Sequence, residues 1–145
     1  MSGAFLLDVN VLIAMSWPAH VAHEKVQKWF SKHGRAGCAT CPFTEAVFVR
    51  ILSNPAFSPN ALTTADAFQL LGSNLKHPAH EFWPDNIGLL EATSSFLSKI
   101  RGHQQVADAY LLGLALHRMG KLATLDAGMP ALQAGSGERD LVTVI

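Results

Sequence analysis

Charged residues are scarce in this chain. Only 15% of its 145 residues are Asp, Glu, Lys or Arg, and 49% are hydrophobic, whereas an average soluble domain is about 25% charged. The 11 basic and 11 acidic side chains cancel, so the formal net charge is zero. No overall positive field therefore exists to attract a nucleic acid or an anionic membrane. A phosphate-bearing ligand would have to be held by a local cluster of residues or by a metal ion.

Cysteines and long apolar runs are also lacking. Cys38 and Cys41 are the only cysteines, which excludes a disulfide scaffold and favours a reducing cytoplasm. Their spacing is that of half a zinc or redox site, but no second pair completes it. No window approaches the roughly 20 apolar residues of a membrane span, and residues 1–5 lack the features of a secretion signal. We expect one cytoplasmic domain over residues 1–145, without membrane contact.

The rest of the chain alternates between strand and helix patterns. Strands are predicted at residues 4–7, 37–40, 81–83, 121–125 and 141–145. Helices are predicted at residues 9–16, 19–33, 42–53, 63–75, 89–100, 104–119 and 129–133. The helix at 19–33 has a predicted apolar stripe of Val21, Val26, Trp29 and Phe30, and Gly120 is predicted to end the helix at 104–119. Strands that alternate with helices favour an α/β fold with a mainly parallel sheet.

Four acidic residues lie in apolar surroundings, namely Asp8, Glu45, Asp108 and Asp126. Burial of a carboxylate is costly unless it is paired or coordinates a metal, and no Lys or Arg lies within four positions of the three aspartates. Asp8 and Asp126 each end a predicted strand, at the edge of the sheet where α/β proteins bind ligands. Asp108 and Glu45 each lie in the first turn of a predicted helix, where the helix dipole favours an acid.

A divalent cation explains such a set of acids. Mg²⁺ binds carboxylate oxygens and completes its shell with water and substrate phosphate, and a bound ion can activate water. Each acid could instead be a helix cap or the partner of a basic side chain, an alternative that stays open for Glu45 and Asp126 taken singly. Because that alternative needs four separate coincidences, the sequence favours a shared metal site.

The acids lie in four stretches that also point to a known family. The stretches are residues 7–14 (LDVNVLIA), 44–50 (TEAVFVR), 105–111 (QVADAYL) and 123–126 (ATLD). In these stretches and in their order, the chain resembles PIN-domain ribonucleases, and within them the VapC-type toxins of bacterial toxin–antitoxin pairs. The chain shows no departure from the family pattern at the four acids.

The resemblance implies a fold, an activity and partners. It implies a PIN-like three-layer α/β/α sandwich with a five-stranded sheet in the order 3-2-1-4-5. It implies a metal-dependent endoribonuclease that uses Mg²⁺, with Mn²⁺ as a substitute, and metal-activated water to leave a 5′-phosphate and a 3′-hydroxyl. It further implies an RNA substrate, a homodimer and a cognate antitoxin that covers the active site. The residues that would hold the metal and carry catalysis are Asp8, Glu45, Asp108 and Asp126, with Asn10 orienting a carboxylate.

Other residues are candidates for supporting roles. Thr124 either hydrogen-bonds at the metal site or serves only as a β-branched strand residue. Arg50 follows Glu45 on the same predicted helix, and Arg101 and His103 shortly precede Asp108. These three could bind RNA phosphates, which the overall charge does not attract. Solvated surface positions are the alternative for all three.

Two other functions fit parts of this pattern. Phosphoryl transfer through an aspartyl-phosphate needs a second acid two residues after the first, or a lysine at a later strand end. Asn10 occupies the first of these positions, and residues 141–145 contain no lysine. The remaining alternative is a PIN-fold module that binds RNA or protein without catalysis. The complete acidic set argues against it, because converging carboxylates would only repel a polyanion.

Overall fold

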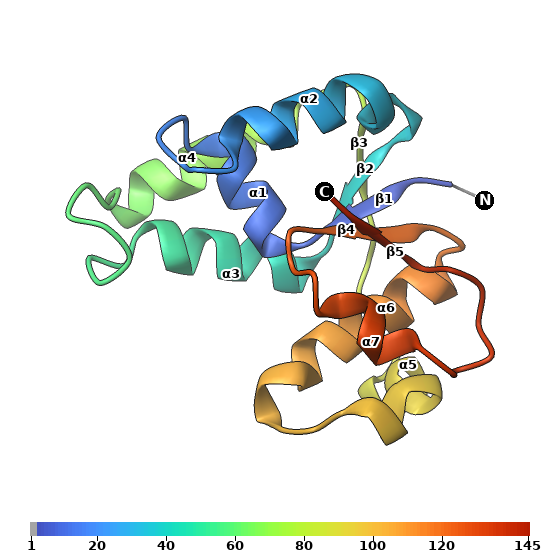
Figure 1. Cartoon of the computed structure of the whole chain (residues 1–145). Coiled ribbons are helices and arrows are strands. Elements are labelled where there is room, and N and C mark those ends of the chain that lie inside the picture. The colour runs from blue at the N-terminus through green and yellow to red at the C-terminus, as the bar shows by residue number, and fades with distance from the viewer. Residues whose placement is uncertain (1–2) are drawn as a thin grey trace.

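Figure 1 shows the computed structural model of the chain, which describes residues 3–145. The strands are β1 (Phe5–Leu7), β2 (Cys38–Thr40), β3 (His80–Phe82), β4 (Lys121–Thr124) and β5 (Val142–Val144). The α-helices are α1 (Val9–Ser16), α2 (His23–His33), α3 (Pro42–Leu52), α4 (Thr64–Asn74), α5 (Leu89–Thr93), α6 (Val106–His117) and α7 (Met129–Gln133). Short 3-10 helices cover Gly34–Ala36, Ser94–Lys99 and His103–Gln105.

The strands form one five-stranded sheet in the order β3-β2-β1-β4-β5, and every neighbouring pair is parallel. Helices α1 to α4 lie on one side of this sheet and α5 to α7 on the other (Figure 1). The predicted three-layer α/β/α architecture and strand order are therefore confirmed. The prediction of a single domain over residues 1–145 includes residues 1–2, which lie outside the described part.

Two apolar cores fill the layers between sheet and helices. In β1, Leu6 belongs to the core under α5 to α7, and Leu7 belongs to the core under α1 to α4. Successive strand side chains point to opposite faces, so a sheet covered on both faces needs apolar residues at every position. This requirement explains why the central strand β1 is a continuous apolar run (Phe5–Leu7), whereas the edge strand β3 carries His80 and Glu81. Within residues 3–145, no helix has both the length and the hydrophobicity to cross a bilayer.

Helix α6 contributes to the core on the α5 to α7 side of the sheet, and its residues 111–115 are all buried. Full burial of each leucine contributes about 2 kcal/mol. The helix approaches α5 closely at Gly113, where an added Cβ would lie 1.9 Å from the carbonyl oxygen of Ala92. Gly113 therefore sets the spacing between the two helices.

The start of α2 differs from the prediction. The helix begins at His23 rather than at residue 19, because the preceding residues form turns in which His20 N–H bonds Trp17 O at 2.9 Å and His23 N–H bonds His20 O at 3.0 Å. Val21 is consequently 98% exposed and does not belong to the apolar stripe. Val26 and Trp29 are buried, as predicted.

The role predicted for Gly120 was wrong. Helix α6 ends at His117, and Met119, not Gly120, takes the left-handed conformation, with a φ of 56°. Gly120 is needed for a close approach instead. A Cβ there would lie 2.5 Å from both Ala4 O and Cη2 of Trp83. A helix-terminating glycine and a close-packing glycine look alike in sequence.

Two other elements differ in detail. Strand β3 begins at His80, one residue earlier than predicted, and Trp83 follows it as a fully buried side chain. The predicted helix at 89–100 continues beyond α5 as a 3-10 helix over Ser94–Lys99.

Gly113→Ala tests the close packing of α5 and α6. The backbone of Ala92 must move to admit the methyl group, so we expect a loss of about 1–3 kcal/mol in the free energy of unfolding. Gly72→Ala is the matched control, because no atom lies within 4 Å of an added Cβ there. Alanine should stabilise α4 by up to about 1 kcal/mol. Chemical denaturation measures both variants, and equal effects would contradict the tight contact.

Candidate active site

The site lies where strand order reverses, between β1 and β4. Leu7 pairs with Ala123 across these strands, and the N–H of Asp8 continues the ladder by bonding Ala123 O at 2.9 Å. Strands β2 and β3 lie on one side of β1 in the sheet, and β4 and β5 lie on the other side. Asp8 and Asp126 therefore meet at the carboxyl edge of the sheet, the position at which ligands bind in open α/β folds.

Asp8 is held by neutral donors on both carboxylate oxygens. Its Oδ1 accepts the backbone N–H of Val9 at 2.7 Å, and its Oδ2 accepts the Thr124 hydroxyl at 2.8 Å. The side chain is only 8% exposed. Burial raises the pKa of Asp8, the two hydrogen bonds lower it, and the charge of Asp126 raises it further. The net effect is a raised pKa.

Thr124 and Asn10 tie β4 to the start of α1. The single Thr124 proton goes to Asp8, while its oxygen accepts the Asp126 N–H at 3.0 Å and the Asn10 amide at 3.4 Å. The Asn10 Oδ1 accepts the N–H of Leu125 at 3.2 Å. Of the two alternatives for Thr124, the structure therefore favours a polar role beside Asp8. Asn10 orients the carboxylate only indirectly, through Thr124.

Asp108 faces Asp8 and Asp126 without a stabilising partner. It lies in the first turn of α6, half-buried, and its carboxylate makes no hydrogen bond with any residue in the range 3–145. Burial, followed by the charges of Asp8 and Asp126, raises its pKa to about 6. Asp126 is exposed, and its Oδ1 accepts the N–H of Gly128 at 2.8 Å. The structure thus brings these three predicted acids within range of one another's charge.

The chemistry of this set fits a hard divalent cation. All donors are oxygens, which suit Mg²⁺ or Mn²⁺, and the mutual repulsion that raises the pKa of Asp108 is what a cation would relieve. Within the described residues, no three Asp, Glu, His or Cys side chains are close enough to form a ready-made metal cluster. The aspartates therefore form an open cluster rather than a closed cage.

Glu45 lies to one side of the three aspartates. Its charge is not among the causes that shift the pKa of Asp8 or of Asp108. Its Oε2 instead accepts the Thr40 hydroxyl at 2.6 Å, and the same hydroxyl lies 2.8 Å from Nε2 of His80. The sequence interpretation missed Thr40 and His80. One signal was available, because Thr40, like Thr124, ends a strand.

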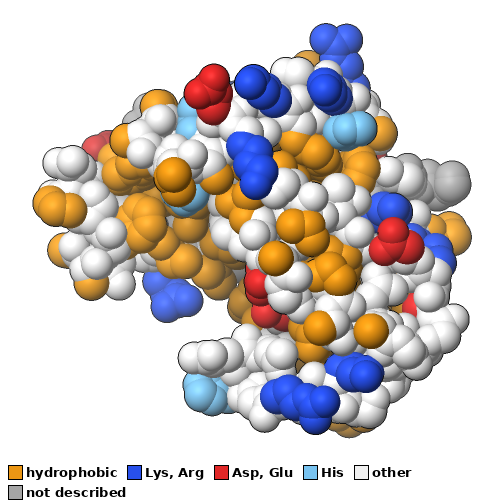
Figure 2. Space-filling view, viewed as in Figure 1, with side chains coloured by type: hydrophobic (Ala, Val, Ile, Leu, Met, Phe, Trp, Pro, Cys, Tyr) orange, Lys and Arg blue, Asp and Glu red, His pale blue; other side chains and the backbone are white. Residues whose placement is uncertain are grey.

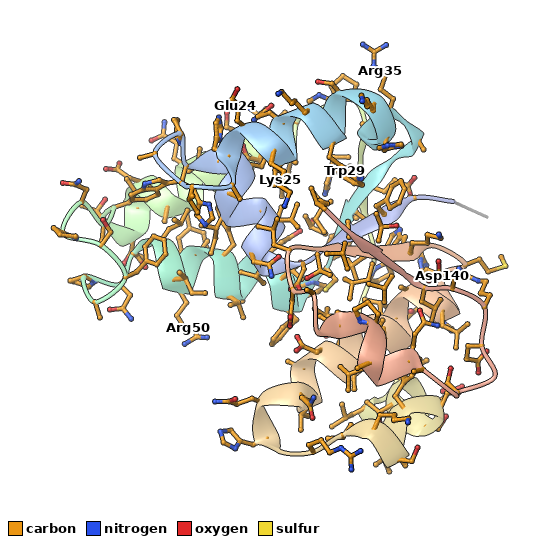
Figure 3. All side chains as sticks on the ribbon, in the orientation of Figure 1. Glu24, Lys25, Trp29, Arg35, Arg50 and Asp140 are labelled. Carbon is orange, nitrogen blue, oxygen red and sulfur yellow. The ribbon has the colours of Figure 1, made fainter. Side chains whose placement is uncertain are left out.

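Arg50 lies beside a notch in the surface, and Arg101 and His103 precede α6 in the chain. Figure 2 shows acidic atoms at the inner end of a hollow between the α3 side and the side that leads into α6, and Arg50 projects from α3 on the same side (Figure 3). Arg101 and His103 are exposed and line a further hollow of about 300 Å³. Within residues 3–145, only Lys121 and Asp140 form an ion pair, at 3.7 Å. Both arginines are therefore available to a ligand.

A separate cleft is lined in part by Thr40 and His80. That cleft, of about 480 Å³, lies between α1, α2 and the segment that joins α4 to β3, and none of the four predicted acids lines it. Acidic atoms are instead visible in the open notch of Figure 2.

Comparison with known proteins identifies the family of the chain. Residues 5–134 match the model of the PIN domain family. The chain belongs to the PIN-domain family. This PIN domain is 39% identical over 140 residues to Ribonuclease VapC39 of Mycobacterium tuberculosis, covering 97% of the chain and 98% of that protein. It is 41% identical over 124 residues to Ribonuclease VapC38, covering 86% of each, and 36% identical over 141 residues to Ribonuclease VapC44, covering 96% and 98%. The predicted family is confirmed.

Asp108→Asn tests the repulsion at this site. The pKa of Asp108 rises from 3.8 to about 6 on folding. The Asp108 carboxyl group therefore binds its proton more tightly in the folded protein than in the unfolded chain. Stability is therefore lost as pH rises from about 4 to 6. Asparagine removes that loss, so the metal-free variant should be more stable than the unsubstituted protein at pH 7.5. We expect about 1 kcal/mol, a value discounted for partial exposure, and no difference at pH 4.

Urea denaturation in EDTA at both pH values measures this effect. Asp66→Asn is the matched control, since Asp66 occupies the first turn of α4 and its loss should be neutral or slightly destabilising. Destabilisation of the Asp108→Asn variant at pH 7.5 would contradict the repulsive cluster.

Proposed function

We propose that this chain is a divalent-metal-dependent endoribonuclease and the toxin of a type II toxin–antitoxin pair. The observation that carries the proposal is the meeting of Asp8, Asp108 and Asp126 at the edge of the sheet where β1 and β4 end, where none of the three has a basic partner among residues 3–145. Relatives named ribonucleases, aligned over at least 86% of the chain, support the same activity.

The three aspartates would hold Mg²⁺, with Mn²⁺ as a substitute, and Glu45 would contribute from the side. A bound ion of this kind polarises a phosphodiester oxygen and activates water for attack on phosphorus. The Asp108 proton, retained up to a pH of about 6, would be released when the ion binds. Metal affinity should therefore decrease as the pH falls toward that value.

The surrounding residues fix the carboxylates. The Val9 N–H and the Thr124 hydroxyl orient Asp8, and the Gly128 N–H holds one oxygen of Asp126. Asn10 bonds the backbone of Leu125 and so limits movement of the segment between β4 and Asp126. Such preorganisation matters because catalytic groups that are already in place need no rearrangement during the reaction.

RNA would cross the notch with its phosphates near Arg50 on one side and near Arg101 and His103 on the other. The proposal includes a homodimer and a cognate antitoxin, both implied by the resemblance to VapC-type toxins. Apolar side chains are available for such contacts, since Leu90 is 85% exposed and Leu97 is 60% exposed.

Cleavage of RNA is the direct test of the activity. Total bacterial RNA is incubated with the protein and Mg²⁺ or Mn²⁺, and the new 5′-phosphate ends are sequenced. We expect discrete cuts that EDTA abolishes and that Asp108→Asn reduces about 100-fold or more, because a metal-binding carboxylate is lost. Asp66→Asn should cleave normally. Cuts that persist in Asp108→Asn would exclude the proposed site, and no cuts with any metal would favour a non-catalytic binding module.

Arg50→Gln and Arg101→Gln test the path of the RNA. Each should raise KM with little change in kcat, and each should reduce the slope of log KM against log salt by about 0.7 if one phosphate contact is lost. Arg35→Gln is the control, because Arg35 lies at the far end of α2 from the notch (Figure 3). Salt slopes that match those of Arg35→Gln would place the RNA elsewhere.

A further inference from the structure

Glu45 is anchored by a buried hydroxyl rather than by a charge. Its Oε2 lies 2.6 Å from Thr40 Oγ1, and Thr40 is only 2% exposed. An ionised carboxylate has no proton to give, so the Thr40 hydroxyl is the donor. Within residues 3–145, no hydrogen bond reaches the other oxygen, Oε1. One oxygen of Glu45 is fixed, and the other stays free for a ligand.

His80 completes this arrangement from the neighbouring strand. The Thr40 proton is committed to Glu45, so its oxygen can only accept from His80 Nε2, which lies 2.8 Å away. The imidazole must therefore carry a proton on Nε2. Burial lowers the pKa of His80, although the charges of Glu45 and Glu81 and a hydrogen bond with the Leu75 backbone act in the opposite direction. The hydrogen bonds run from β3 through the end of β2 to the first turn of α3.

The backbone between Thr40 and Glu45 is also constrained. Thr44 is fully buried, and its hydroxyl accepts the Cys41 N–H and donates to Cys41 O, both at 3.0 Å. Pro42 starts the helix. The short connection therefore leaves Glu45 little freedom besides its own side-chain torsions, and Thr40 restricts those.

Asp8 is held in the same way, by a threonine at the end of the strand on the other side of β1. Thr124 ends β4 and donates to Asp8, while Thr40 ends β2 and donates to Glu45. Both β2 and β4 are neighbours of β1. Each threonine is in turn contacted by a further polar side chain, Asn10 at Thr124 and His80 at Thr40. Two strands that flank β1 thus support one acid each through a terminal threonine.

We propose that Thr40 and His80 are positioning residues that hold Glu45 ready to bind a divalent cation, as Thr124 and Asn10 do for Asp8. The proposal rests on the proposed metal-dependent function. Hydrogen-bond partners of metal-binding carboxylates typically contribute about 10–100-fold to metal affinity or activity.

Paired substitutions test this role. Thr40→Val keeps the shape of the side chain and removes the hydroxyl, whereas Thr40→Ser keeps the hydroxyl. We expect Thr40→Val to weaken Mn²⁺ binding, measured by calorimetry, about 10-fold or more and to lower kcat on RNA with KM unchanged. Thr40→Ser should restore both values to within a few-fold of the unsubstituted protein. Thr93→Val is the control, because Thr93 is also buried, at 4% exposed, but its hydroxyl donates to the carbonyl of Leu89.

A double-mutant cycle separates positioning from a general effect on stability. In a Glu45→Gln background, Thr40→Val should cause no further loss of Mn²⁺ affinity, since the carboxylate that it positions is gone. A further loss in that background, or equal effects of Thr40→Val and Thr93→Val, would overturn the proposal. His80→Gln, which can still donate a hydrogen bond, compared with His80→Leu provides a second pair if Thr40→Val does not fold.

A third measurement needs neither metal nor RNA. Nitrogen NMR of the metal-free protein should show His80 protonated on Nε2, and this tautomer preference should disappear in Thr40→Val. If the unsubstituted protein neither binds Mn²⁺ nor cleaves RNA, the proposed function fails whatever the tautomer. If it does both, and His80 is protonated only on Nδ1, the positioning role alone fails.

Discussion

Repulsion among Asp8, Asp108 and Asp126 is the constraint that the rest of the structure must accommodate. Burial and the two neighbouring charges raise the pKa of Asp108 to about 6, so near neutral pH this edge of the sheet opposes folding. The apolar cores on both faces of the sheet and the central helix α6 offset that cost. An arrangement that weakens the empty protein but suits a cation is typical of a functional site rather than of a structural one.

The donors that hold the acids are all neutral. Asp8 is bonded by a backbone N–H and a hydroxyl, and Glu45 by a hydroxyl that is backed by His80. An arginine or lysine in these places would orient the carboxylates equally well, but its positive charge would also occupy the role of the metal ion. Neutral donors fix direction and leave the negative charge available. The scarcity of basic residues near the aspartates, visible in the sequence, has the same physical basis.

Sequence patterns predict what local chemistry determines. The bounds predicted for α1 and α7 match the structure, and the meeting of Asp8 with Asp126 follows from their shared position at strand ends. The start of α2 was missed, because Val21 fits a helical period although turns near Pro18 delay the helix. Gly120 and the Thr40–His80 contact depend on tertiary approach. Thr40 and His80 lie 40 positions apart, and only the pairing of β2 with β3 brings them together.

The balance of charges also bears on how a neutral protein could hold RNA. Acidic atoms lie at the inner end of the notch and Arg50 projects beside it, while Arg101 and His103 are exposed residues that precede α6. Without a cation, the centre repels a phosphate that the flanking residues attract, so the two tendencies oppose each other. A divalent ion at the aspartates would make the charge at the centre of the notch positive. The centre and the flanking basic residues would then both attract phosphate. In the proposed function the ion would contribute to binding RNA as well as to cleaving it, and a chain with no net positive charge could then act on a polyanion.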